Sequence, residues 1–275
     1  MISKKRFLVG GVAVALMAGT LVSTPAKAAS SELVIGSVLD IDKLDPHTST
    51  NFATVRALGL VYSSLVEVGP GNKLKTGLAS SWSFNAAGTQ LKLVLRQGVK
   101  FHDGSTFDAI DAKATLERIL DVKTAAAARA NVSTITSITA AGRFLTLTLS
   151  VPNVPILAAL DGVNMAMLSS TDIAAGKVGG SNKPNGTGPY KYVSWEPTQS
   201  VKFVSNPGYW MGAPKITNLT IRVIPNESSI LSAMNAGTIQ FGIVTDPLIA
   251  KQISTKSLKL FKVPALAYYA LQLNT

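Results

Sequence analysis

Two regions of the chain alternate apolar and polar residues with the period of two that is typical of half-buried β-strands. In QLKLVLRQG (residues 90–98) leucine occupies positions 91, 93 and 95, with lysine and arginine between and beyond them. SWSFN (81–85) precedes this segment across the turn residues AAG. Further on, STITSITA (133–140) and RFLTLTLS (143–150) flank Ala141 and Gly142. The pattern therefore predicts two antiparallel hairpins.

Other segments predict helices or buried strands. ELVIGSVL (32–39) is a largely apolar, β-branched run that predicts a buried strand. TVRALGLVYSSLVEV (54–68) predicts a helix that leads into an extended piece, followed by a turn at GPGN (69–72). Asp108 is a suitable N-cap for a helix that reaches about Leu120, because an acidic side chain is favourable at a helix N-terminus.

Beyond residue 180 the pattern changes to short strands that alternate with helices. YKYVSWE (190–196), SVKFVSN (200–206) and NLTIRVIPN (218–226) predict strands, and 228–235 predicts a helix that ends with Gly237 as its C-cap. FGIV, LKLFKV (258–263) and LAYYALQLNT (266–275) predict further strands. We therefore expect an α/β layer with a mostly antiparallel insert between residues 51 and about 180.

The first 28 residues have the order of a secretion signal. A cationic start (residues 4–6) precedes an uncharged run from Phe7 to Val22 and then the small-x-small sequence AKA (26–28). The apolar run is shorter than the roughly 20 residues that a membrane-spanning helix needs. An uncleaved membrane anchor is the alternative. We expect cleavage near Ala28, no stable membrane insertion afterwards, and a periplasmic protein.

Composition narrows the possible functions. The chain contains no cysteine, which excludes thiolate catalysis, cysteine zinc sites and lipid attachment to an N-terminal cysteine. The formal charge is +11, and removal of the four cationic residues of the predicted signal leaves +7. The lysines are dispersed and no arginine-rich run alternates with aromatic residues, so we expect a solvated basic surface and no nucleic-acid binding.

Candidate chemistry is sparse. The two histidines, His47 and His102, stand in no close-spaced pair of metal ligands, and neither a nucleophile elbow nor a phosphate loop occurs. Asp40, Asp42, Asp45 and His47 are a possible cation site, but Pro46 favours an extended Asp45, and turns recruit aspartate for hydrogen bonds to their own backbone. GTGP (186–189) resembles an anion loop only superficially, since Pro189 lacks a backbone donor. We predict structural roles for these motifs, with no cofactor and no metal.

Several longer phrases stand out over most of the chain after the predicted signal: LDP (44–46), VYSSLVEV (61–68), LASSWSFNAAGTQLKLVLRQGVKFHDGSTFDAIDA (78–112), GTGPYKYVSWEP (186–197), NPGYWMGAPKITNLTIRVIP (206–225) and MNAGTIQF (234–241). Together, and in family order, they resemble the family 5 extracellular solute-binding proteins, the dipeptide, oligopeptide and nickel receptors of ABC importers.

The resemblance implies a type II periplasmic binding-protein fold. It implies lobe I at 29–50 and 181–275, an inserted α+β subdomain at 51–180, and a missing second lobe, since the chain stops at Thr275 within a predicted strand. It also implies a receptor, without enzymatic activity, that delivers a peptide or similar small solute to a membrane permease. The implied ligand contacts are Leu39, Asp40, Ile41, Asp42, Tyr268, Tyr269 and Asn274. A secreted non-transport protein, or an enzyme that acts on cell-wall peptides or glycans, is the alternative.

Overall fold

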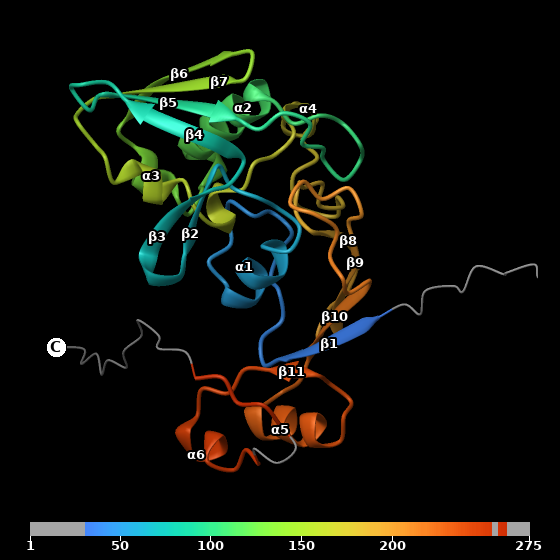
Figure 1. Cartoon of the computed structure of the whole chain (residues 1–275). Coiled ribbons are helices and arrows are strands. Elements are labelled where there is room, and N and C mark those ends of the chain that lie inside the picture. The colour runs from blue at the N-terminus through green and yellow to red at the C-terminus, as the bar shows by residue number, and fades with distance from the viewer. Residues whose placement is uncertain (1–30, 255–257, 263–275) are drawn as a thin grey trace, which may run out of the picture.

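The computed structural model describes residues 31–254 and 258–262 (Figure 1). The strands are β1 (Glu32–Ser37), β2 (Val66–Gly69), β3 (Lys73–Thr76), β4 (Ala79–Phe84), β5 (Gln90–Leu95), β6 (Ile135–Ala141), β7 (Phe144–Leu149), β8 (Tyr190–Glu196), β9 (Ser200–Ser205), β10 (Asn218–Val223) and β11 (Phe241–Gly242). The α-helices are α1 (Phe52–Leu58), α2 (Ala109–Leu120), α3 (Ile156–Ala159), α4 (Ser170–Ala174), α5 (Glu227–Asn235) and α6 (Pro247–Ala250). Short 3-10 helices lie at Pro70–Asn72, Val122–Thr124, Arg129–Val132 and Val163–Met165.

One sheet has five strands in the order β11-β1-β10-β9-β8. Strand β1 runs parallel to β10 and to β11, whereas β10, β9 and β8 pair in antiparallel fashion. Leu33 and Ile35 pack on one face of the sheet, and Val34 packs on the other. The predicted buried strand is confirmed, because β1 has apolar neighbours on both of its faces.

Helices cover both faces of this sheet, as an α/β layer requires. Ile230 of α5 packs with Val34 on one face. Ala57 and Leu58 of α1 pack on the other with Phe203 of β9. In Figure 1 α5 and α6 lie below the sheet, and α1 lies above it.

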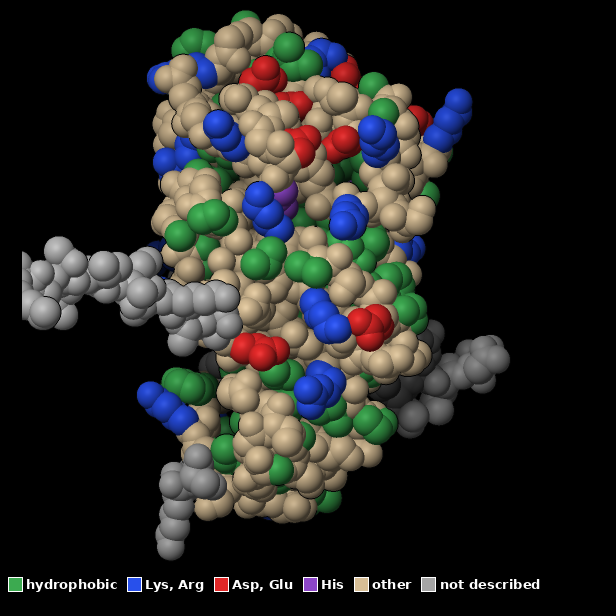
Figure 2. Space-filling model, turned by 90° about the vertical axis from the view of Figure 1, so that its right-hand side faces the viewer, with side chains coloured by type: hydrophobic (Ala, Val, Ile, Leu, Met, Phe, Trp, Pro, Cys, Tyr) green, Lys and Arg blue, Asp and Glu red, His purple; other side chains and the backbone are tan. Residues whose placement is uncertain are grey.

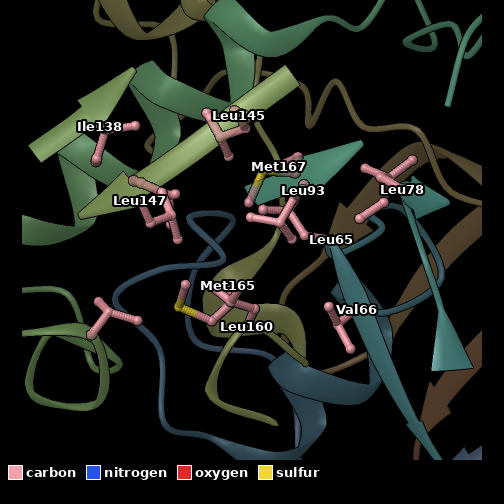
Figure 3. Packing of buried hydrophobic residues seen from close by; sticks show 14 of the residues in the cluster. Leu65, Val66, Leu78, Leu93, Ile138, Leu145, Leu147, Leu160, Met165 and Met167 are labelled. Atoms are coloured by element: carbon pink, nitrogen blue, oxygen red, sulfur yellow. The ribbon is translucent and has the colours of Figure 1, made fainter. Parts of the chain in front are cut away.

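The second sheet has four antiparallel strands in the order β4-β5-β7-β6, which confirms both predicted hairpins. Leucines 91, 93 and 95 point into a large apolar cluster, and α2 covers the same face through Leu116 and Ile119. Figure 3 shows Leu93, Leu145 and Leu147 of this sheet in that cluster, with Met165 and Met167 also in it. The alternation of the sequence thus corresponds to one buried face.

Helix α2 begins as predicted. The side chain of Asp108 accepts hydrogen bonds from the backbone N–H groups of Ile110 and Asp111, and the side chain of Asp111 accepts one from the backbone N–H of Asp108. This reciprocal capping box satisfies N–H groups that have no partner inside the helix.

Three details differ from the sequence prediction. Helix α5 ends at a C-cap of Ala236, and Gly237 follows it with φ of 72°, a conformation that glycine adopts without strain. The predicted turn at 69–72 contains a short 3-10 helix. The described part of the predicted strand 258–263, residues 258–262, is irregular, so that prediction was wrong there. The predicted domain boundaries at 28, 50 and 180 stay predictions.

Candidate functional site

The candidate site lies at the edge of the five-stranded sheet where the parallel strands end. Strands β1 and β10 end there in register, at Ser37 and Val223. The turn between β8 and β9 lies at the same edge, because Ser200 at the start of β9 pairs with Arg222 near the end of β10. Ligands of α/β proteins commonly bind outside the carboxyl ends of parallel strands. The loop that follows β1, which contains the predicted contact residues Leu39–Asp42, begins at this edge.

The predicted contact residues of that loop point in different directions. The side chain of Leu39 is 51% exposed, whereas Ile41 is only 5% exposed and packs in the apolar cluster of the sheet. Asp42 accepts hydrogen bonds from the hydroxyls of Ser49 (2.7 Å) and Thr54 (2.6 Å). Although partial burial acts in the opposite direction, these hydrogen bonds lower the pKa of Asp42. Leu39 is therefore the one predicted apolar contact in this loop that faces solvent.

Asp40 is fully engaged with donors from the protein itself. Its carboxylate accepts from the backbone N–H of Ile41 (2.8 Å), the indole Nε1–H of Trp195 (3.1 Å to each oxygen) and the backbone N–H of Thr198 (2.7 Å). Its carbonyl oxygen accepts from the side chain of Asn51 (3.2 Å). Asp40 thus connects the loop to the end of β8 and to the β8–β9 turn.

The main chain at Val38 is available for binding. Val38 is 40% exposed, and none of the described residues forms a hydrogen bond with its N–H or C=O. The next residue differs, since both main-chain groups of Leu39 bond the hydroxyl of Ser37. Within the described part of the chain, this edge therefore has one peptide N–H and one peptide C=O without a partner, beside an exposed leucine. Such groups can pair with an extended peptide.

The residues that follow this loop are largely buried. Asp45 and His47, together with Arg118, form a cluster that we call the buried anchor. Arg118 of α2 forms an ion pair with Asp45 at 2.6 Å, and it donates to Nδ1 of His47, also at 2.6 Å. Nε2 of His47 donates to the carbonyl oxygen of Ala166 at 2.8 Å. Burial, with the Arg118 guanidinium also nearby, lowers the pKa of His47 to about 4. His47 is therefore neutral and belongs to the scaffold, as the sequence indicated.

No group of three or more His, Asp or Glu side chains with the spacing of a metal site occurs among the described residues. The carboxylates of Asp40, Asp42 and Asp45 instead each bond different residues of the protein.

The GTGP loop bonds His102. The backbone N–H of His102 donates to the carbonyl oxygen of Gly186, and Nε2 of His102 contacts the carbonyl oxygen of Gly188. A side chain at either glycine would overlap with the carbonyl group of Val61, so the GTGP loop packs as a tight structural turn.

The structure adds two residues that the sequence analysis did not single out, Trp195 and Thr198. In the sequence, SWEP is the end of a predicted strand and part of a family-like phrase, without a role in binding. The local signal was the turn sequence EPT beside a tryptophan, but nothing local identifies the partner, which lies 155 residues earlier. The remaining predicted contacts, Tyr268, Tyr269 and Asn274, lie outside the described residues.

A further hollow of about 400 Å³ lies on another side of the molecule, where charged side chains of both signs surround a histidine (Figure 2). Its lining includes His102, Asp103, Asp172 and Lys191. The carboxylates of Asp103 and Asp172 both accept from the amide of Asn185, and Lys191 donates to the carbonyl oxygen of His102. These groups bond one another and hold the 102–105 turn against the loop before β8.

The structure combines a mixed five-stranded sheet with a separate four-stranded antiparallel sheet. The sequence pattern of the bacterial extracellular solute-binding proteins, family 5, middle region, matches residues 73–275. The chain belongs to this family of ABC-importer binding proteins, as the resemblance implied. The relatives that are similar to this chain are solute-binding proteins and not enzymes.

Individual relatives agree with this placement. The chain is 27% identical over 271 residues to the glutathione-binding protein GsiB of Shigella flexneri, covering 96% of this chain and 51% of that protein. It is 30% identical over 243 residues to GsiB of Pectobacterium atrosepticum, covering 86% and 46%. The chain thus spans about half the length of the curated relatives it matches.

Solved structures show the same fold. The peptide complex of DppA from Helicobacter pylori, with the peptide STSA, matches with a TM-score of 0.73 and 25% identity, over 81% of this chain and 49% of that one. NikZ from Campylobacter jejuni, in complex with Ni(L-His), matches with 0.67 and 26%, over 76% and 42%. The predicted α/β fold with an antiparallel subdomain is confirmed. Among the described residues, no helix has the length and apolarity needed to cross a membrane.

Proposed function

We propose that this chain supplies one lobe of a periplasmic receptor that captures a peptide or a similar small solute and delivers it to the permease of an ABC importer. The proposal rests chiefly on Val38 at the parallel-strand edge, an exposed residue whose main-chain groups have no partner among the described residues. These two groups, the N–H and C=O of Val38, can pair with the backbone of an extended ligand. Export through the predicted signal at residues 1–28 belongs to the same proposal.

The proposed ligand wall consists of Val38 and the loop Leu39–Asp42, together with Tyr268, Tyr269 and Asn274. In this wall Leu39 contributes an apolar side chain, and Val38 contributes its main chain. The tyrosines would add flat apolar faces with a polar tip. A second lobe would close over the solute, and closure would be favoured by the extra contacts that the solute makes in the closed state.

Peptidic ligands are favoured by the relatives. The similar curated proteins are named for glutathione, and one similar structure holds the peptide STSA. Nickel bound to histidine in NikZ is the competing ligand chemistry. The described residues of this chain gather no set of metal-ligating side chains, so a nickel complex would have to be recognised through its organic ligand or through residues elsewhere. We therefore place peptides first.

The test is binding by the protein encoded by the whole gene. Glutathione, the peptide Ser-Thr-Ser-Ala and the nickel–histidine complex are titrated by calorimetry and by thermal unfolding. A ligand at 100 times its Kd stabilises the folded state by about 2.7 kcal/mol. Mass spectrometry of the recovered ligand separates the alternatives, because a receptor returns it unchanged and a cell-wall hydrolase would convert it. Absence of binding to all three probes contradicts the proposed solute classes.

A matched pair of variants locates the site. Leu39→Ala removes an exposed apolar side chain from the proposed wall and should weaken binding about tenfold, which corresponds to roughly 1.4 kcal/mol. Val122→Ala removes a side chain that is 69% exposed in the 3-10 helix after α2, far along the chain from the proposed wall, and should leave the affinity unchanged. Equal effects of the two variants would place the site elsewhere.

A further inference from the structure

The loop after β1 is attached to the β8–β9 turn through one carboxylate. Asp40 accepts from the indole of Trp195 and from the backbone N–H of Thr198 while its own neighbour Ile41 also donates to it. The β8–β9 turn is also fixed to the end of β10, because the backbone N–H of Val223 donates to the carbonyl oxygen of Gln199 at 2.8 Å. Three strand ends are therefore joined at the edge that carries the proposed ligand wall.

Thr198 has a backbone conformation that a threonine rarely adopts. Its φ is 63°, in the left-handed region where a β-branched side chain is strained. Such strain costs on the order of 1 kcal/mol or more and persists only where surrounding contacts hold it. One such contact is the 2.7 Å hydrogen bond from the Thr198 N–H to Oδ2 of Asp40. Besides the backbone hydrogen bonds of Gln199 with Glu196 and Val223, the turn is therefore held by the residue that also shapes the loop.

We propose that Asp40 is a positioning residue, which locks the loop to the β8–β9 turn and thereby presents the main chain of Val38 to the ligand. The inference rests on the proposed function. Both oxygens of Asp40 are occupied by internal donors, so its side chain acts on the ligand through the loop and not by contact. In Asp40→Asn an amide nitrogen would replace one carboxylate oxygen. This nitrogen would face an N–H donor and could not accept a hydrogen bond from it.

The test compares Asp40→Asn with Asp103→Asn in the protein encoded by the whole gene. Both substitutions replace a turn carboxylate by its neutral isostere, and Asp103 lies in the 102–105 turn, where it accepts from Ser105. For Asp40→Asn we expect amide hydrogen exchange at Ile41 and Thr198 to accelerate at least tenfold in the ligand-free protein. We also expect the affinity for the bound probe, beginning with glutathione, to fall at least tenfold. Asp103→Asn should change neither quantity.

A double variant separates positioning from contact. If Asp40 acts through the loop, Asp40→Asn should cost less affinity in the Leu39→Ala background than in the native protein, because part of the positioned contact is already absent. Additive effects of the two substitutions, or a loss of affinity without faster exchange at Thr198, would indicate direct contact and overturn the inference.

Two further outcomes are decisive. Faster exchange with unchanged affinity would overturn the positioning role and leave the proposed receptor function intact. No binding of any probe by the native protein would contradict the proposed function and this inference together. If Asp40→Asn does not fold, Trp195→Phe replaces it, since phenylalanine keeps an aromatic ring and removes only one donor. Its expected effect has the same direction and is smaller, and an unchanged affinity would overturn the inference.

Discussion

The segment Ser37–Thr50 contains two regions with similar residues and opposite environments. The first region, Val38–Asp42, lies at the sheet edge with an exposed leucine, and the main chain of Val38 has no partner among the described residues. The second region is centred on Asp45 and His47, whose side chains are enclosed by α2 and by the chain at Ala166. In the first region aspartate fixes the shape of the loop, and in the second it forms a buried ion pair. A cluster of aspartates and a histidine in the sequence can therefore have two separate structural roles without forming one binding site.

The largest expected effect concerns the buried anchor. Arg118→Ala would leave the carboxylate of Asp45, 15% exposed in its side chain, without its cation. Loss of one partner of a buried pair typically costs about 3–5 kcal/mol. The control is Lys202→Ala, which breaks the exposed pair of Lys202 and Glu196 and should cost less than about 1 kcal/mol. Urea unfolding measures both, and similar losses would show that the anchor contributes no more than a surface pair.

A second comparison contrasts two neighbours in the loop itself. Ile41→Ala removes a buried side chain from the apolar cluster and should lower the free energy of unfolding by about 2–4 kcal/mol. Leu39→Ala should change it by less than about 0.5 kcal/mol, because the side chain is mostly exposed. Chemical denaturation of both variants tests this assignment. A larger loss of stability in Leu39→Ala than in Ile41→Ala would show that Leu39 is the buried side chain and that Ile41 is the exposed one.

Acid should destabilise the protein through the buried anchor. The pKa of His47 is lowered to about 4 in the folded protein from an ordinary value of 6.5. Between these values the unfolded chain binds a proton that the folded protein does not, so stability is present above about pH 6.5 and is lost as the pH falls towards about 4. The loss through His47 should be on the order of 3 kcal/mol. Burial also lowers the pKa of His102, which adds an effect of the same sign.

Urea unfolding at about pH 7 and about pH 4.5 checks this dependence. In His47→Gln the difference between the two pH values should shrink, because only His102 then contributes to this histidine effect. The native protein and the variant are compared by their change between the two pH values, since the substitution itself also affects stability. An unchanged pH dependence in His47→Gln would mean that His47 is protonated in the folded state or exposed.

Local patterns predicted much of the fold but little of the site. Alternating leucines identified β5 because one face of the antiparallel sheet is buried, and Asp108 identified the start of α2 because capping is local. Residues 258–262 are also rich in apolar and basic residues, but they are irregular. A strand also needs a neighbour that satisfies its backbone, and a sequence pattern does not supply one. The contact of Asp40 with Trp195 joins residues 155 positions apart, and no local pattern encodes it.

The smallest expected effect tests the strain at the β8–β9 turn. Thr198→Gly keeps the N–H that Asp40 accepts and removes the left-handed strain, so it should be neutral or stabilise the fold by up to about 1 kcal/mol. Gln199→Gly places the same flexible residue one position later, where φ is not positive, and should destabilise by about 0.5–1 kcal/mol. Thermal unfolding compares the two. The same loss in both variants would show that the turn is relaxed in the native protein, and that Asp40 holds the loop without holding strain.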